Sequence, residues 1–175
     1  MRARTAIPWR FLCIALALVA VCAFADSDDL EPAPNFHAKT LDGAQFNNAS
    51  VKGKVVLLDF WTTWCPLCEA EENLVDNLGA EFANKGLIVL AVNVGESKKT
   101  VKKYLENNPR KTPVVLTDDT NLAAMYEATV YPIYVVIDRD GNIAGTQRGA
   151  GGERALRRLL ALAGIRSDKD QNSDQ

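Results

Sequence analysis

The apolar residues of this chain alternate between short continuous runs and stretches with helical spacing. Residues 54–60 and 87–94 are nearly continuous apolar runs rich in β-branched side chains, which is typical of strands buried on both faces. Between them, residues 66–85 carry apolar side chains at helical spacing, and Gly86 follows as a stop. The positions expected to share the buried face of this helix are Leu67, Leu74, Leu78 and Phe82.

The second half of the chain continues this alternation. We expect a helix over residues 97–107 with Ser97 as its N-cap, a strand over 112–116, a short helix over 119–127, strands over 133–138 and 142–148, and a closing helix over 153–163. Near the N-terminus, residues 35–48 around a turn at 41–43 predict a β-hairpin. This order predicts an α/β fold in which a central mixed β-sheet is flanked by helices, with the hairpin as an N-terminal extension.

The first 25 residues have the pattern of a secretory signal peptide. Three arginines precede an apolar run over residues 11–24, and an acidic segment follows the expected cleavage site at Ala25. The alternative is an uncleaved anchor formed by residues 11–25, although this run is shorter than the roughly 20 residues that cross a bilayer comfortably. Either way we expect a periplasmic or otherwise extracytoplasmic protein. Its expected parts are a linker over 26–33, one folded domain over 34–165 and a polar tail over 166–175.

Loss of the expected signal peptide changes the charge balance. Of the 20 lysines and arginines, 17 remain against 22 aspartates and glutamates, which gives a formal net charge of −5. A negatively charged chain of this kind disfavours nucleic-acid binding. With 175 residues, the chain is long enough to bury a core without metals or structural disulfides.

Export would also reduce the cysteine count to one closely spaced pair. Cys13 and Cys22 lie in the expected signal peptide, so Cys65 and Cys68 remain. A disulfide that closes so short a loop removes little entropy from the unfolded chain, so reactivity explains the pair better than stability does. Cys65 falls between a buried strand and the start of a helix, where free backbone N–H groups and the helix dipole favour a thiolate. Pro66 fits the first helical turn, and Cys68 lies one turn further, placed to resolve a mixed disulfide on Cys65.

Three other chemistries compete with this interpretation. A structural zinc site needs four ligands, and the chain offers one histidine, His37, and no second cysteine pair after export. A copper(I)-binding assembly factor could use both thiolates, since soft ligands select that ion. A peroxiredoxin-like peroxidase is suggested by the Thr-x-x-Cys pattern over residues 62–65, although it leaves Cys68 unexplained.

The segment Asp-Phe-Trp-Thr-Thr-Trp-Cys-Pro-Leu-Cys over residues 59–68 resembles the signature of thioredoxin-like proteins. Residues 130–132, followed by a predicted strand, resemble the segment that supplies this family's cis-proline. The leader, the hairpin and Glu71 resemble the extracytoplasmic TlpA-like and ResA-like branch. The resemblance implies a thioredoxin fold and a thiol:disulfide oxidoreductase whose redox group is the Cys65–Cys68 disulfide, with no further cofactor and no metal.

The resemblance also implies roles for residues around the pair. Asp59 or Glu71 would be the acid/base for Cys68, and Pro132 would follow a cis peptide bond. Substrate contacts would come from Trp64, Pro66, Tyr131 and Pro132, with Trp64 near the surface. Ala91 stands where thioredoxins carry a lysine, which predicts an Asp59 carboxylate that is poorly stabilised as an anion.

The direction of electron flow is expected to be that of a reductant, because Pro66 and Leu67 add no charged or imidazole partner for the thiolate. The implied partners are protein thiols and disulfides, with apocytochrome c as the leading candidate, and a membrane electron donor upstream. We expect the protein to act as a monomer.

Overall fold

The computed structural model describes residues 30–167. The expected signal peptide over 1–25 lies outside the described residues, as do half of the expected linker over 26–33 and most of the expected tail over 166–175. Within residues 30–167, none of the helices combines the length and apolar character needed to span a membrane.

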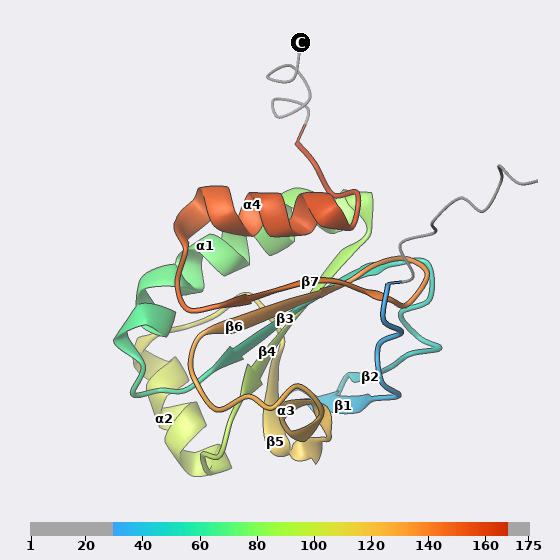
Figure 1. Cartoon of the computed structure of the whole chain (residues 1–175). Coiled ribbons are helices and arrows are strands. Elements are labelled where there is room, and N and C mark those ends of the chain that lie inside the picture. The colour runs from blue at the N-terminus through green and yellow to red at the C-terminus, as the bar shows by residue number, and fades with distance from the viewer. Residues whose placement is uncertain (1–29, 168–175) are drawn as a thin grey trace, which may run out of the picture.

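A seven-stranded mixed sheet forms the centre of the described fold, with the strand order β2-β1-β5-β4-β3-β6-β7 (Figure 1). Its strands are β1 (His37–Thr40), β2 (Gln45–Asn47), β3 (Val55–Trp61), β4 (Leu87–Asn93), β5 (Val114–Thr120), β6 (Ile133–Ile137) and β7 (Ile143–Arg148). β3, β4 and β5 run parallel, whereas β6 and β7 pair antiparallel beside β3, and β1 pairs antiparallel with both β2 and β5. β3 and β4 are the central strands, and β3 leads directly to the cysteines.

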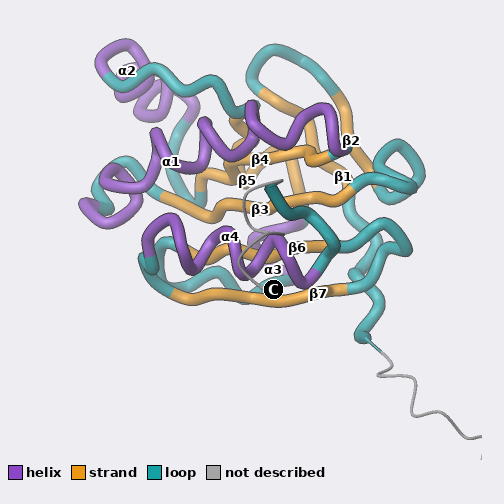
Figure 2. The backbone as a smooth tube through the Cα atoms, turned by 90° about the horizontal axis from the view of Figure 1, so that it is seen from above, coloured by secondary structure: helices purple, strands orange, loops and turns teal. Residues whose placement is uncertain are grey.

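Helices cover both faces of this sheet. They are α1 (Pro66–Phe82), the 3₁₀ helix η2 (Ala83–Lys85), α2 (Lys98–Asn107), α3 (Leu122–Met125) and α4 (Gly152–Leu162). Figure 2 shows α1 and α4 side by side over one face, with α3 behind the sheet. Alternate residues of β3 point to opposite faces of the sheet. Val55 and Leu57 pack with α1 and α4, whereas Val56 and Leu58 pack in the core that contains residues of α3. By the same alternation, Asp59 lies on the side of α1.

The predicted elements are present, with two differences. The expected helix over 119–127 is wrong in its first part, because β5 extends to Thr120, which pairs with Ala38 of β1 and donates a hydrogen bond to the carbonyl of His37. Tertiary pairing therefore outweighs the local helical pattern there. The expected burial of Leu67 is also wrong, because its side chain is 54% exposed at the margin of the buried stripe of α1.

Candidate active site

The cysteine pair lies at the N-terminus of α1 as a disulfide, with the two Cα atoms 5.3 Å apart. Cys65 is the N-cap residue with extended backbone dihedrals, Pro66 occupies the first turn, and the Cys65 Sγ accepts a hydrogen bond from the backbone N–H of Cys68 at 3.1 Å. A sulfur in this position faces the positive end of the helix dipole. The arrangement favours a thiolate at Cys65, and Cys68 follows it by one helical turn.

The loop before Cys65 is held in place by an acidic residue that no local sequence pattern marks. The carboxylate of Glu96 accepts hydrogen bonds from the backbone N–H and the hydroxyl of Thr63, and a further one from the side-chain amide of Asn93. Glu96 lies between β4 and α2, so it ties the end of β4 to the loop between β3 and α1. This contact holds the segment from which Trp64 projects.

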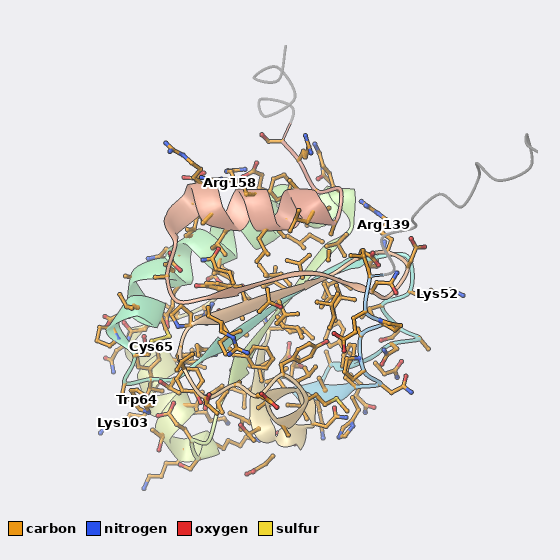
Figure 3. The ribbon with its side chains drawn as sticks, viewed as in Figure 1. Lys52, Trp64, Cys65, Lys103, Arg139 and Arg158 are labelled. Carbon is orange, nitrogen blue, oxygen red and sulfur yellow. A yellow bond between two sulfur atoms is a disulfide. The ribbon has the colours of Figure 1, made fainter. Side chains whose placement is uncertain are left out.

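The cis Tyr131–Pro132 peptide bond predicted from the family resemblance is present. The ring of Tyr131 packs against the cluster that contains both cysteines and meets Trp64 edge-on, with ring centroids 5.8 Å apart. Trp64 is 68% exposed, as expected, and Figure 3 shows it beside Cys65 at the end of the molecule where α1 begins. The tertiary structure therefore joins two segments that are more than sixty residues apart in sequence.

Exposed apolar side chains gather on the segments that carry the cysteines and the cis-proline. Besides Trp64, Leu67 and Val130 are each more than half exposed. An apolar surface beside a reactive disulfide is suited to contact with a polypeptide substrate.

Asp59 is buried in the middle of the sheet, where β3 pairs it with Ala91 of β4 and Tyr134 of β6. Its carboxylate forms an ion pair with Arg110 at 2.7 Å, and both side chains are almost fully buried. Burial raises the pKa of Asp59, and the positive charge of Arg110 opposes that rise. The raised pKa agrees with the expectation of a poorly stabilised carboxylate, but the sequence did not indicate that Arg110 supplies a cation in place of the missing lysine. Arg110 comes from the loop between α2 and β5, where no local pattern marks it.

Glu71 lies one turn after Cys68 and is also buried. Its Oε2 accepts a hydrogen bond from the Tyr134 hydroxyl at 2.7 Å, and its Oε1 accepts bonds from the backbone N–H groups of Gly151 and Gly152 at 3.0 and 2.6 Å. These bonds join α1 to β6 and to the start of α4. The charge of Glu71 also adds to the rise in the pKa of Asp59.

Burial of Asp59 leads to a prediction about stability and pH. Because its pKa is raised above the ordinary value of 3.8, folding favours the protonated carboxyl. The stability gained in this way is complete below that ordinary value and is lost as the pH rises through the folded-state pKa. We therefore expect Asp59→Asn to become more stable relative to the wild-type protein as the pH rises from about 4 to about 8.

Urea unfolding of both proteins across this range measures the difference, with the exposed Asp118→Asn as the control. If the stability of Asp59→Asn relative to wild type stays constant or falls as the pH rises, the assignment is contradicted.

Residues 30–146 match the sequence profile of the AhpC/TSA family. The chain belongs to the AhpC/TSA family. It is 32% identical over 123 residues to a thiol-disulfide oxidoreductase ResA of Bacillus cereus, covering 69% of this chain and 71% of ResA.

Solved structures agree with this assignment. A putative thiol:disulfide interchange protein DsbE from Chlorobium tepidum superposes with a TM-score of 0.69 at 26% identity, covering 77% of this chain and 96% of DsbE. A secreted Mycobacterium tuberculosis disulfide oxidoreductase, described as homologous to E. coli DsbE, gives 0.60 at 25% identity over 74% of this chain and 95% of its own.

This AhpC/TSA-family protein is a thiol-disulfide oxidoreductase of the thioredoxin-like fold, with Cys65 and Cys68 as its disulfide. Its substrates are protein thiols and disulfides. Over residues 30–167, no three His, Cys, Asp or Glu side chains are grouped so as to hold a metal ion.

Proposed function

We propose that the protein acts outside the cytoplasm as a reductant of protein disulfides. The charged and apolar pattern of residues 1–25 supports export. The similarity to a secreted oxidoreductase and to a DsbE protein is consistent with that location.

The proposed direction of electron flow, from this protein to its substrate, rests on the environment of the two sulfur atoms. In the described part of the chain, the hydrogen bond to the Cys65 Sγ comes from a backbone N–H group, and no lysine, arginine or histidine side chain bonds to either sulfur. Glu71 and Glu72, on the buried side of α1, follow Cys68 by about one turn and bring negative charge. The helix N-terminus stabilises the Cys65 thiolate, but no cationic side chain adds to that effect. The disulfide is therefore favoured over the dithiol more than it would be beside a positive charge, and the reduced protein is expected to give up its electrons readily.

The reaction follows from the placement of the sulfurs. The Cys65 thiolate attacks a disulfide of the substrate, forms a mixed disulfide and releases one substrate thiolate. Cys68 then loses its proton and attacks the Cys65 Sγ, which forms the internal disulfide and releases the second substrate sulfur. Two electrons pass to the substrate, and a dithiol donor at the membrane returns the pair to its reduced state.

Apocytochrome c is the client we propose first, because its paired cysteines present the exposed disulfide that such a reductant would open. Trp64 and Tyr131 would bind the apolar residues that flank this disulfide, together with the nearby surface of Pro66. The backbone at Tyr131, before the cis-proline Pro132, would pair with the extended client chain.

The reduction potential tests the proposed direction. Equilibration with defined glutathione or dithiothreitol buffers, followed by alkylation of free thiols, should give a value closer to about −270 mV than to about −120 mV. A potential near that of strong oxidases would overturn the reductant proposal. It would leave the assignment of the cysteine pair intact.

A further inference from the structure

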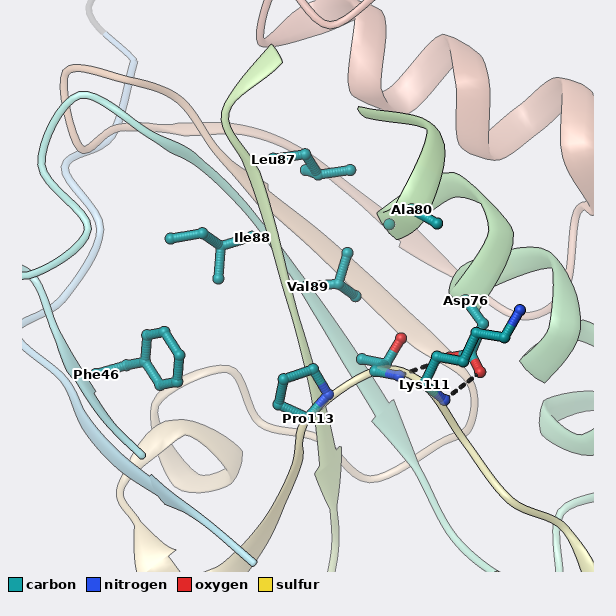
Figure 4. Close-up of a pocket in the computed structure, with 10 residues that line it drawn as sticks. Phe46, Asp76, Ala80, Leu87, Ile88, Val89, Lys111 and Pro113 are labelled. Atoms are coloured by element: carbon teal, nitrogen blue, oxygen red, sulfur yellow. Dashed lines mark hydrogen bonds between the residues drawn. The ribbon is translucent and has the colours of Figure 1, made fainter. Parts of the chain in front are cut away.

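The loop that carries Arg110 is anchored to α1. Asp76 of α1 accepts hydrogen bonds from the backbone N–H groups of Lys111 and Thr112 at 2.6 and 3.0 Å, as the dashed lines in Figure 4 show. Because Asp76 holds the two residues that follow Arg110, the arginine side chain enters the protein at a fixed place.

The guanidinium group of Arg110 lies between an acid and an aromatic ring. Its Nη2 donates to the Asp59 Oδ2 at 2.7 Å, its Nε is 3.9 Å from the Asp76 Oδ1, and its central carbon is 5.2 Å from the centre of the Trp61 ring. The Arg110 side chain is only 1% exposed. Trp61 packs in the same cluster as Cys65 and Cys68. Arg110 therefore pairs directly with the buried acid and contacts a member of the cluster that contains both cysteines.

The groups that face this pair come from every neighbouring element. The acidic ones are Asp59 of β3 and, from α1, Glu71, Glu72 and Asp76; the phenols are Tyr104 of α2 and Tyr134 of β6. Within the described residues, Arg110 is the cation that forms ion pairs with these buried carboxylates. An isolated carboxyl at such a depth would stay protonated and could not accept a proton.

We propose that Arg110 is a positioning residue for disulfide exchange, which keeps the Asp59 carboxylate ionised and oriented so that it accepts the proton of Cys68. This proposal rests on the thiol-disulfide chemistry of the cysteine pair. In the resolving step the Cys68 S–H bond breaks and its proton passes to Asp59. The Cys68 sulfur then bonds to the Cys65 Sγ, and the substrate sulfur leaves with the electron pair of the mixed disulfide. Arg110 touches neither sulfur and acts through Asp59.

The electrostatics agree with this geometry. Burial raises the pKa of Asp59, while the charge of Arg110 and its hydrogen bond limit the rise. Removing the cation is therefore expected to move the titration of Asp59 to higher pH. The rate of the resolving step should follow, because it needs Asp59 in its ionised form.

Reaction of the reduced full chain with 5,5′-dithiobis(2-nitrobenzoate) isolates this step. Attack by Cys65 releases one thionitrobenzoate anion, and resolution by Cys68 releases the second. The Cys65→Ser/Cys68→Ser double variant measures the background release that comes from Cys13 and Cys22, and this background is subtracted. We expect Arg110→Met to shift the pH midpoint of the second release upward by about one unit, which makes the step about tenfold slower below the midpoint. Arg110→Lys should show a smaller shift in the same direction.

A double-mutant comparison separates this role from a purely structural one. In the Asp59→Asn background, Arg110→Met should change the second release less than about twofold, because Arg110 then has no carboxylate through which to act. The surface control Arg157→Met should leave the midpoint unchanged. An unshifted midpoint in Arg110→Met overturns the proposal, as does an equal shift with and without Asp59. If Arg110→Met does not fold, an unshifted midpoint in Arg110→Lys overturns it.

This assay uses a small-molecule disulfide and follows one step from the reduced protein. Its result does not depend on the physiological client or on the direction of electron flow. A failure of the reductant proposal would appear in the reduction potential, whereas a failure of the Arg110 proposal would appear only in the pH profile of the second release.

Discussion

Cys65→Ser is expected to reduce disulfide exchange to the uncatalysed rate. The thiolate at the start of α1 makes the first bond to the substrate, and a serine hydroxyl cannot replace it as a nucleophile towards sulfur. Cys68→Ser should instead complete the first attack and stop, because the side chain that releases the mixed disulfide is missing. The two variants should therefore fail at different steps, although each lacks a single sulfur atom.

Mixing each variant with oxidised apocytochrome c and separating the products on a non-reducing gel measures this difference. Cys68→Ser should accumulate a mixed-disulfide complex that dithiothreitol cleaves, and Cys65→Ser should form no such complex. A complex formed by Cys65→Ser alone would reverse the roles of the two sulfurs. A Cys68→Ser protein that captures other exported proteins but not apocytochrome c would reject that client and keep the mechanism.

Glu71→Ala is expected to lower the free energy of unfolding by about 3 kcal/mol, because it leaves several buried or partly buried donors without their carboxylate. Those donors are the hydroxyl of Tyr134 and the backbone N–H groups of Gly151 and Gly152. Hydrogen bonds to a charged acceptor are stronger than neutral ones, and these bonds join three elements of the fold. The loss should appear as a lower denaturation midpoint in urea.

The matched control is Glu106→Ala, since Glu106 is an exposed glutamate on α2 and its removal should change stability by less than about 0.5 kcal/mol. Glu71→Gln tests the acid/base role that the family resemblance offers for this residue. If Glu71 exchanges the proton of Cys68, Glu71→Gln should abolish the pH dependence of the resolving step. A Glu71→Ala protein as stable as the control would contradict the structural role inferred from the three hydrogen bonds.

Local sequence patterns predicted most of the fold because burial imposes a period on each element. The continuous apolar runs became β3 and β4, which are buried along nearly their whole length. The helical stripe over 153–163 became α4, whose buried residues are Leu156, Leu159 and Leu160. The helix predicted over 119–127 failed only at its first residues, 119 and 120, where the competing interaction is not local. β5 continues there because β1, eighty residues earlier, supplies a partner strand.

The part of the site that depends on neighbouring residues was also predictable from the sequence, whereas contacts between distant segments were not. Cys65, Pro66 and Cys68 lie at the start of one helix, so their spacing along the chain determines how they are placed relative to one another. Trp64 and Tyr131 were selected separately, and only the folded chain brings their rings together. Glu96 was not selected at all, because two of its three hydrogen bonds come from Thr63, in a loop that precedes it by about thirty residues.

By itself, the sequence determined the redox pair, its place at a strand–helix junction and the order of the elements, since each depends on near neighbours and on periodic burial. Only the tertiary structure decided the electrostatic partner of Asp59. The alanine at position 91 removes the usual lysine partner and predicts a poorly stabilised carboxylate, but Arg110 pairs with Asp59 from a loop 51 residues away. Burying a carboxylate is costly without a counter-charge, but this requirement does not say where in the chain the cation must come from. The packing of that loop against β3 and α1 places the Arg110 side chain beside Asp59.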